Sequence, residues 1–154
     1  MLVADLDIIY WAASLGGEHY TGYLCYNKNG NRDEYTRHEL QYPLSTSQAK
    51  YLNKKDKFRG YEKGMLSNRF FTIEELYKYA IEHAKENNID VVVKDGSSIQ
   101  PGPVIYCKHD EIREELEMIS ERAAEMYEQS YDPWATFGKE ADDLWEMWEN
   151  ILKG

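Results

Sequence analysis

The chain has 154 residues, 42% of them hydrophobic and 30% charged, and a formal net charge of −10. This composition argues against global disorder, and the length predicts a single domain over residues 1–154. The net charge comes entirely from residues 110–154, which carry 14 Asp or Glu and four Lys or Arg, because residues 1–109 carry 14 of each sign. The chain therefore divides into a neutral to basic part, residues 1–109, and an acidic part, residues 110–154.

The chain shows no pattern for export or for crossing a membrane. Asp5 and Asp7 stand where a signal peptide would carry Lys or Arg. The longest apolar stretch, residues 8–13, is too short to span a bilayer. Cys25 and Cys107 lie far apart and form no CxxC motif, so no disulfide framework is indicated. We expect a cytoplasmic protein that has no membrane partner.

The first 55 residues predict strands followed by a short helix. Residues 2–15 fit either a strand or a helix that ends at the glycine pair 16–17. Residues 20–27 are rich in Tyr, Thr and Leu, and Asn29-Gly30 is typical of a type I′ turn. A β-hairpin that returns over residues 31–37 is therefore predicted. Ser45 and Gln48 have the spacing of a capping box, which predicts a helix through about residue 53.

The middle of the chain predicts one helix and two strands. Thr72 and Glu75 form a second capping-box pattern, and apolar residues recur at helical spacing up to the Asn pair 87–88. Residues 89–93 are β-branched and apolar, which is typical of a central strand. Residues 104–107 predict another short strand after a Pro- and Gly-rich loop.

The acidic part predicts two helices. Ile112, Leu116, Ile119, Ala123 and Met126 step by four and three residues, as in a heptad seam, and the Asp-Pro pair 132–133 ends this helix. Residues 139–152 predict a last helix, with Trp145 and Trp148 assigned to its core side. Together these elements predict an α+β fold, with a small antiparallel sheet that includes the hairpin and about four helices, the last two forming an acidic pair.

The acidic pair predicts a binding surface, because a one-signed surface repels nucleic acid and attracts basic protein faces. The candidate field-forming residues are Glu114, Glu117, Glu121, Glu125 and Glu128, and the candidate aromatic anchors are Tyr131, Trp134 and Phe137. We therefore expect an acidic macromolecule-binding protein whose partner is a basic protein surface, that of a nucleic-acid-binding protein, without direct contact to nucleic acid. One version of this hypothesis is an inhibitor or nucleic-acid mimic, in the manner of small acidic phage-encoded inhibitors with an anti-defence role.

Residues 50–63 form a basic stretch in which Tyr51, Phe58 and Tyr61 alternate with cations. One interpretation is a contact with nucleic acid or another anion. The other is an internal electrostatic partner of the acidic helices, or a solvated loop. The negative net charge of the chain favours the second interpretation.

A catalytic alternative rests on the sequence Gly-Lys-Glu-Ala-Asp-Asp-Leu at residues 138–144. This motif, with the early segment 3–10, resembles the flap endonuclease and phage 5′-nuclease family, whose members hydrolyse phosphodiesters with carboxylate-bound metals. The resemblance implies Asp5, Glu140, Asp142 and Asp143 as ligands of Mg²⁺ or Mn²⁺.

A second resemblance concerns the spacing of carboxylates on the predicted helices. Glu114-x-x-Glu117 and Glu140-x-x-Asp143 are similar to the paired carboxylates of MazG-type nucleotide pyrophosphohydrolases. Either resemblance implies a metal-dependent phosphohydrolase. The binding hypothesis, which we prefer, requires no catalytic residue, no metal and no cofactor.

Overall fold

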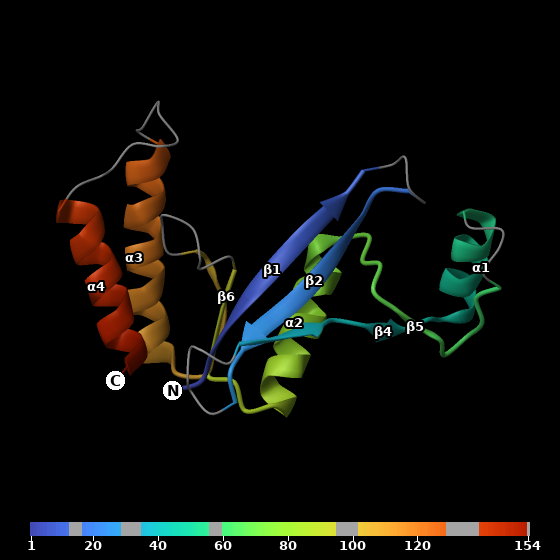
Figure 1. Cartoon of the computed structure of the whole chain (residues 1–154), viewed down its shortest axis with the longest axis horizontal. Coiled ribbons are helices and arrows are strands. Elements are labelled where there is room, and N and C mark those ends of the chain that lie inside the picture. Colours follow the sequence, from blue (N-terminus) through green and yellow to red (C-terminus); the bar gives the residue numbers. More distant parts are fainter. Residues whose placement is uncertain (13–16, 29–34, 56–59, 95–101, 129–138, 154) are drawn as a thin grey trace.

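The computed structural model describes residues 1–12, 17–28, 35–55, 60–94, 102–128 and 139–153 (Figure 1). The strands in these ranges are β1 (Val3–Trp11), β2 (His19–Tyr26), β3 (Thr36–Glu39), β4 (Tyr42–Pro43), β5 (Leu66–Ser67), β6 (Val91–Lys94) and β7 (Val104–Cys107). The helices are α1 (Thr46–Lys55), α2 (Ile73–Glu86), α3 (Asp110–Glu128) and α4 (Lys139–Lys153). Residues 3–11 are thus a strand, which settles the alternative between strand and helix for the start of the chain.

The main sheet has five strands in the order β3-β2-β1-β6-β7, and β4 and β5 form a separate two-stranded sheet. The α+β class is confirmed. The main sheet is mixed, because β1 and β6 run parallel whereas its other neighbouring strands run antiparallel. Val3 pairs with Val91 and Leu6 with Lys94, so the predicted strand after residue 88 lies inside the sheet. The crossover between these parallel strands contains α2, as parallel pairing requires a long connection.

The predicted hairpin forms, but its return strand lies further along the chain. A two-residue turn at Asn29-Gly30 would place Tyr26 opposite residue 33, whereas Tyr26 pairs with Thr36. The described return strand, β3, overlaps the predicted range 31–37 at residues 36–37 and continues to Glu39, and the turn residues themselves lie outside the described ranges. An odd shift of register reverses the faces of a strand. In the observed register His38 stacks on Tyr26 with ring centroids 4.7 Å apart.

Local capping explains where α1 and α2 begin. The Ser45 backbone nitrogen donates to Gln48 Oε1 over 2.8 Å, and the Gln48 nitrogen donates to Ser45 Oγ over 3.2 Å. Thr72 Oγ1 accepts a hydrogen bond from the Glu75 nitrogen over 3.2 Å. These side chains satisfy backbone donors that a helix start would otherwise leave unpaired, so both predicted helix starts are confirmed.

The main sheet has an apolar core on each face. On one face Ala4, Leu6 and Val92 pack with Leu76 and other residues of α2. On the other face lie the buried side chains of Val91, Val93, Cys107, Leu116, Ile119, Ala123, Leu144 and Trp148, which join β6 and β7 to α3 and α4. This alternation follows from the two-residue period of a strand. Figure 1 shows α3 and α4 at one end of the long axis, and α1 with β4 and β5 at the other.

Candidate functional site

The helix pair α3–α4 is the candidate site, and its inner side is a normal apolar core. Leu116 is fully buried and Trp148 is 4% exposed, while Trp145 is partly buried against the same cluster. The predicted heptad seam of α3 therefore faces the sheet and α4. Because the apolar core uses only this inner side, most of the outer side is available for other contacts.

The outer side of the pair is almost entirely acidic. Its exposed acidic residues are Asp110, Glu111, Glu114, Glu115, Glu121, Glu125 and Glu128 on α3, and Glu140, Asp142, Asp143 and Glu146 on α4. The basic residues of these helices whose side chains are described are Arg113, Arg122 and Lys139. Helical spacing places Glu114, Glu121 and Glu128 opposite the buried seam.

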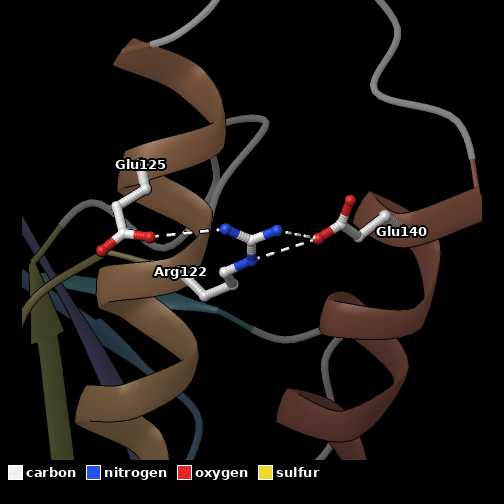
Figure 2. A network of polar contacts seen from close by, with 3 residues as sticks. All are labelled: Arg122, Glu125 and Glu140. Atoms are coloured by element: carbon white, nitrogen blue, oxygen red, sulfur yellow. Dashed lines mark hydrogen bonds and ion pairs between the residues drawn. The ribbon is translucent and has the colours of Figure 1, made fainter.

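Two arginines neutralise part of this surface. Figure 2 shows Arg122 of α3 between Glu125 on its own helix and Glu140 on α4. Arg122 Nε and Nη2 both donate to Glu140 Oε1, the former over 3.1 Å, and the hydrogen bond and charge of Glu140 raise the pKa of Arg122. Arg113 Nε donates to Glu117 Oε1 over 3.0 Å. Glu117, Glu125 and Glu140 are thus paired within the helix pair.

The other three predicted carboxylates on α3 have no cationic side chain paired with them among the described residues. Glu114, Glu121 and Glu128 are exposed and have no ion pair within the part of the chain that the structure describes. They follow one another at intervals of seven residues, so they form a row along the outer side of α3. This row, rather than the full predicted set of five, is the part of the set that has no cationic partner among the described residues.

Two exposed methionines interrupt the acidic surface. Met118 is 69% exposed and lies one turn from Glu114 on the outer side of α3, and Met147 is 52% exposed on α4. No role was predicted for these two methionines from the sequence, although both fall outside the apolar seams of their helices. A flexible thioether side chain adapts to partners of varied shape, so these residues are candidate apolar anchors. The predicted anchors Tyr131, Trp134 and Phe137 lie outside the described residues.

The structure does not bring the proposed metal ligands together. Asp5 is half-buried in β1, whereas Glu140, Asp142 and Asp143 are exposed in the first turns of α4. Within the described ranges, no three His, Cys, Asp or Glu side chains are grouped so that they could hold a metal ion. The MazG-like pairs are also engaged in part, because Glu117 contacts Arg113 and Glu140 contacts Arg122.

A separate polar cluster lies on the sheet face opposite α2. Cys25 Sγ lies 3.6 Å from Asp7 Oδ2, and Arg37 Nη2 lies 3.8 Å from the same oxygen. The Arg37 guanidinium also lies 4.2 Å from the centre of the Tyr23 ring. Burial, followed by the charge of Asp7 and its hydrogen bond, raises the pKa of Cys25 to about 11. Cys25 is therefore a thiol at neutral pH and a poor nucleophile.

The fold separates the acidic and basic regions of the chain. Helix α1, which carries the basic residues Lys50, Lys54 and Lys55, lies at the opposite end of the long axis from α3 and α4 (Figure 1). For the described residues of the basic stretch, the alternative of an internal electrostatic partner of the acidic helices is therefore wrong. The reason is topological, because the main sheet stands between the two regions.

Comparison with protein families, curated protein sequences and solved structures finds no match to this chain. Among the described helices, none is both long enough and apolar enough to cross a membrane.

Proposed function

We propose that the outer side of α3 and α4 binds a basic surface of another protein. The observation that carries this proposal is the row Glu114, Glu121 and Glu128, which is exposed and unpaired within the described residues. A row of like charges that are not paired within the protein raises the rate of association with an oppositely charged partner. The paired residues Glu117 and Glu125 contribute less, because arginines already balance them.

Affinity would come from a small number of apolar contacts within the charged surface. Exposed surface charges contribute modestly to affinity because water and salt screen them. Met118 and Met147 supply apolar area on each helix of the pair. A partner segment with lysines or arginines on its rim and aliphatic side chains at its centre fits this arrangement.

A nucleic-acid-binding protein is the partner class that we favour. The nucleic-acid-binding cleft of such a protein presents cationic side chains to phosphates. A row of carboxylates can pair with the same cationic side chains. The protein would then act as an inhibitor that competes with nucleic acid, as small acidic phage-encoded inhibitors do. The acidic helix pair itself would make no direct contact with nucleic acid.

A binding titration with a defined cationic probe tests the proposal. The probe is a fluorescent amphipathic Lys/Leu peptide of about 20 residues, long enough to follow one helix of the pair. We expect saturable binding that weakens as salt is raised. The triple variant Glu114→Gln, Glu121→Gln and Glu128→Gln should bind the peptide at least about tenfold more weakly than the unchanged protein does, because it loses local charge complementarity.

A matched variant controls for net charge. Glu74, Glu82 and Glu86 are exposed glutamates of α2, and changing them to Gln removes the same charge elsewhere. We expect this control to retain binding within about twofold, since its residues lie outside the acidic helix pair. Equal losses in the two triple variants would mean that the peptide responds only to net charge, and the proposal would be wrong.

A further inference from the structure

We infer that the lobe at the opposite end of the molecule binds single-stranded nucleic acid. The basic lobe is defined here as residues 42–55 and 60–67, which comprise β4, α1, the loop that precedes β5, and β5. In the sequence, residues 42–67 carry six Lys or Arg and two Asp or Glu. This site is distinct from the acidic helix pair and does not depend on the function proposed for that pair.

The lobe is a folded unit rather than a solvated loop. Leu44, Ala49 and Leu52 are buried in the core cluster that also contains Leu76. The Leu44 backbone nitrogen donates to Met65 O over 2.9 Å, which ties the strand before α1 to the loop after it. The position of α1 is therefore set before any ligand binds.

The Asn53 side chain joins the loop to α1. Its Nδ2 donates to Tyr61 O over 2.9 Å, and its Oδ1 accepts from the Tyr61 nitrogen over 2.6 Å. This two-point contact fixes the backbone of the loop beside the helix. The exposed Lys63 follows two residues later, so it belongs to the same fixed loop.

The outer side of α1 combines cations with an exposed ring. Lys50 and Lys54 lie one turn apart, and Tyr51 and Lys55 form a parallel row beside them. All four side chains are exposed, and Tyr51 is 43% exposed. Lys50, Lys54, Lys55 and Lys63 have no ion pair within the part of the chain that the structure describes.

The Tyr51 ring is held in a fixed position. Phe71 packs edge-on against it, with ring centroids 5.4 Å apart and an interplanar angle of 90°. Lys55 Nζ lies 5.7 Å from the centre of the Tyr51 ring. A supported ring beside several cations is the combination that stacks unpaired bases while the cations contact phosphates. A duplex, whose bases are stacked internally, would not use the ring, and this favours a single strand.

The negative net charge of the protein does not oppose this assignment. That charge resides in residues 110–154, whose helices α3 and α4 lie at the far end of the long axis (Figure 1). Charges separated by more than about 10 Å are largely screened at moderate salt. A strand bound along α1 would therefore experience the field of the lobe rather than that of the whole chain.

The experiment is a fluorescence anisotropy titration with a labelled oligothymidylate of about 15 nucleotides, which matches the site sizes of such surfaces. We expect binding at about 50 mM salt that weakens strongly by about 200 mM salt. The triple variant Lys50→Gln, Lys54→Gln and Lys55→Gln should reduce the slope of log affinity against log salt by about 2, since each lost phosphate contact removes about 0.7. Tyr51→Ala should weaken binding about tenfold through lost stacking.

Lys85→Gln is the matched control, because Lys85 is an exposed helical lysine near a tyrosine ring, that of Tyr106, outside the lobe. It should bind as the unchanged protein does, and circular dichroism should show every variant folded. Absence of binding at low salt would overturn the inference, as would equal losses in Lys85→Gln and in the lobe variants. A competing polyglutamate that displaces the oligonucleotide equally well, with no effect of Tyr51→Ala, would instead identify the lobe as a site for acidic protein.

Discussion

The Asp90 carboxylate accepts a hydrogen bond from the backbone nitrogen of Leu2, 88 residues earlier in the chain, over 2.9 Å. The Leu2 carbonyl in turn accepts from the Asp90 nitrogen over 2.8 Å. These contacts join the beginnings of β1 and β6, and a second Asp90 oxygen lies 3.6 Å from His109 Nε2 beyond β7. One partly buried side chain therefore links three neighbouring segments of the sheet.

Asp90→Ala should lower the free energy of unfolding by about 1.5–3 kcal/mol, the usual contribution of a hydrogen bond to a charged group. Urea titration followed by circular dichroism measures this change. His109→Gln is the control, because it removes only the half-exposed contact of His109 with Asp90 and should change the free energy by about 1 kcal/mol or less. A smaller effect of Asp90→Ala than of His109→Gln would contradict the role given to the Leu2 contact.

Gly22→Ala should destabilise the protein by about 1–3 kcal/mol through overpacking. An added Cβ would lie 2.5 Å from Leu76 Cδ1 and 3.2 Å from Leu40 Cδ1, and both leucines are buried. Leu76→Ala alone should destabilise by about 2–5 kcal/mol because it leaves a cavity. The double variant Gly22→Ala with Leu76→Ala should be less destabilised than the sum, since the methyl then has space. If urea titration shows that the losses of stability in the two single variants add up in the double variant, the contact with Leu76 is not what makes Gly22→Ala destabilising.

Stability should decrease as the pH falls below about 6.5, the ordinary pKa of histidine. Burial lowers the pKa of His83, and the charges of His38 and Lys28 lower it further, against an opposing contribution from Glu86. The unfolded chain then binds a proton at a higher pH than the folded chain does, so acid favours unfolding. Tyr26 Oη, 3.2 Å from His83 Nε2, also faces the ring.

His83→Gln should therefore show a smaller loss of stability than the unchanged protein between about pH 7.5 and about pH 5.5, the interval in which a histidine takes up its proton. Urea midpoints at the two pH values provide the comparison. Above about pH 7.5 both proteins should respond to pH alike, because a histidine is neutral there in both states. If the two proteins lose the same stability between about pH 7.5 and about pH 5.5, groups other than His83 determine the acid sensitivity.

Cys25 should react slowly with iodoacetamide at about pH 8. A thiol of pKa about 11 has about a hundredfold less thiolate at this pH than a thiol at the ordinary value of 9.0. Asp7→Asn removes the charge next to the thiol and should accelerate alkylation, measured by mass spectrometry of the peptide that contains Cys25. Glu39→Gln changes a carboxylate on the same sheet face that contacts Tyr23 rather than the thiol, and should leave the rate unchanged. Equal rates in the two variants would refute the role of Asp7.

The metal-dependent alternative makes a separate prediction about melting. The early strand that this alternative requires is present, since Asp5 lies on β1. On our binding proposal, replacing EDTA with Mg²⁺ or Mn²⁺ should not raise the melting temperature, and Asp143→Ala should melt alike in each condition. A metal-dependent rise that disappears in Asp143→Ala would indicate a carboxylate site, since a ligand of the folded state stabilises it. Nucleotides and flap DNA would then be the substrates to test.

Helices were predictable from the sequence because their signals are local. The capping pairs Ser45 with Gln48 and Thr72 with Glu75 each lie within four residues, and both form as expected. The parallel pairing of β1 with β6 left no such signal, because its two strands are separated by the whole hairpin, the lobe and α2. The register of β3, in which Tyr26 pairs with Thr36, was also not predicted, because it brings together residues ten positions apart rather than following from a local pattern.

The candidate site was predictable in outline but not in its charge balance. Periodicity identified the outer glutamates of α3, and the same periodicity marks Met118 as an outer residue. The contact of Arg122 with Glu140 joins two helices, so sequence spacing could not reveal which carboxylates are already paired. The separation of acidic and basic regions to opposite ends likewise depends on how the sheet is assembled.

The pairing of Val3 with Val91 also determines the order in which the chain can fold. β1 and β2 are close in sequence and can pair as soon as both have left the ribosome. β1 cannot gain its second neighbour until synthesis has passed residue 94, and closing so long a loop carries a large entropic penalty. The edge of β1 that pairs with β6 therefore stays unpaired until β6 has been synthesised, and the sheet can be completed only after that point.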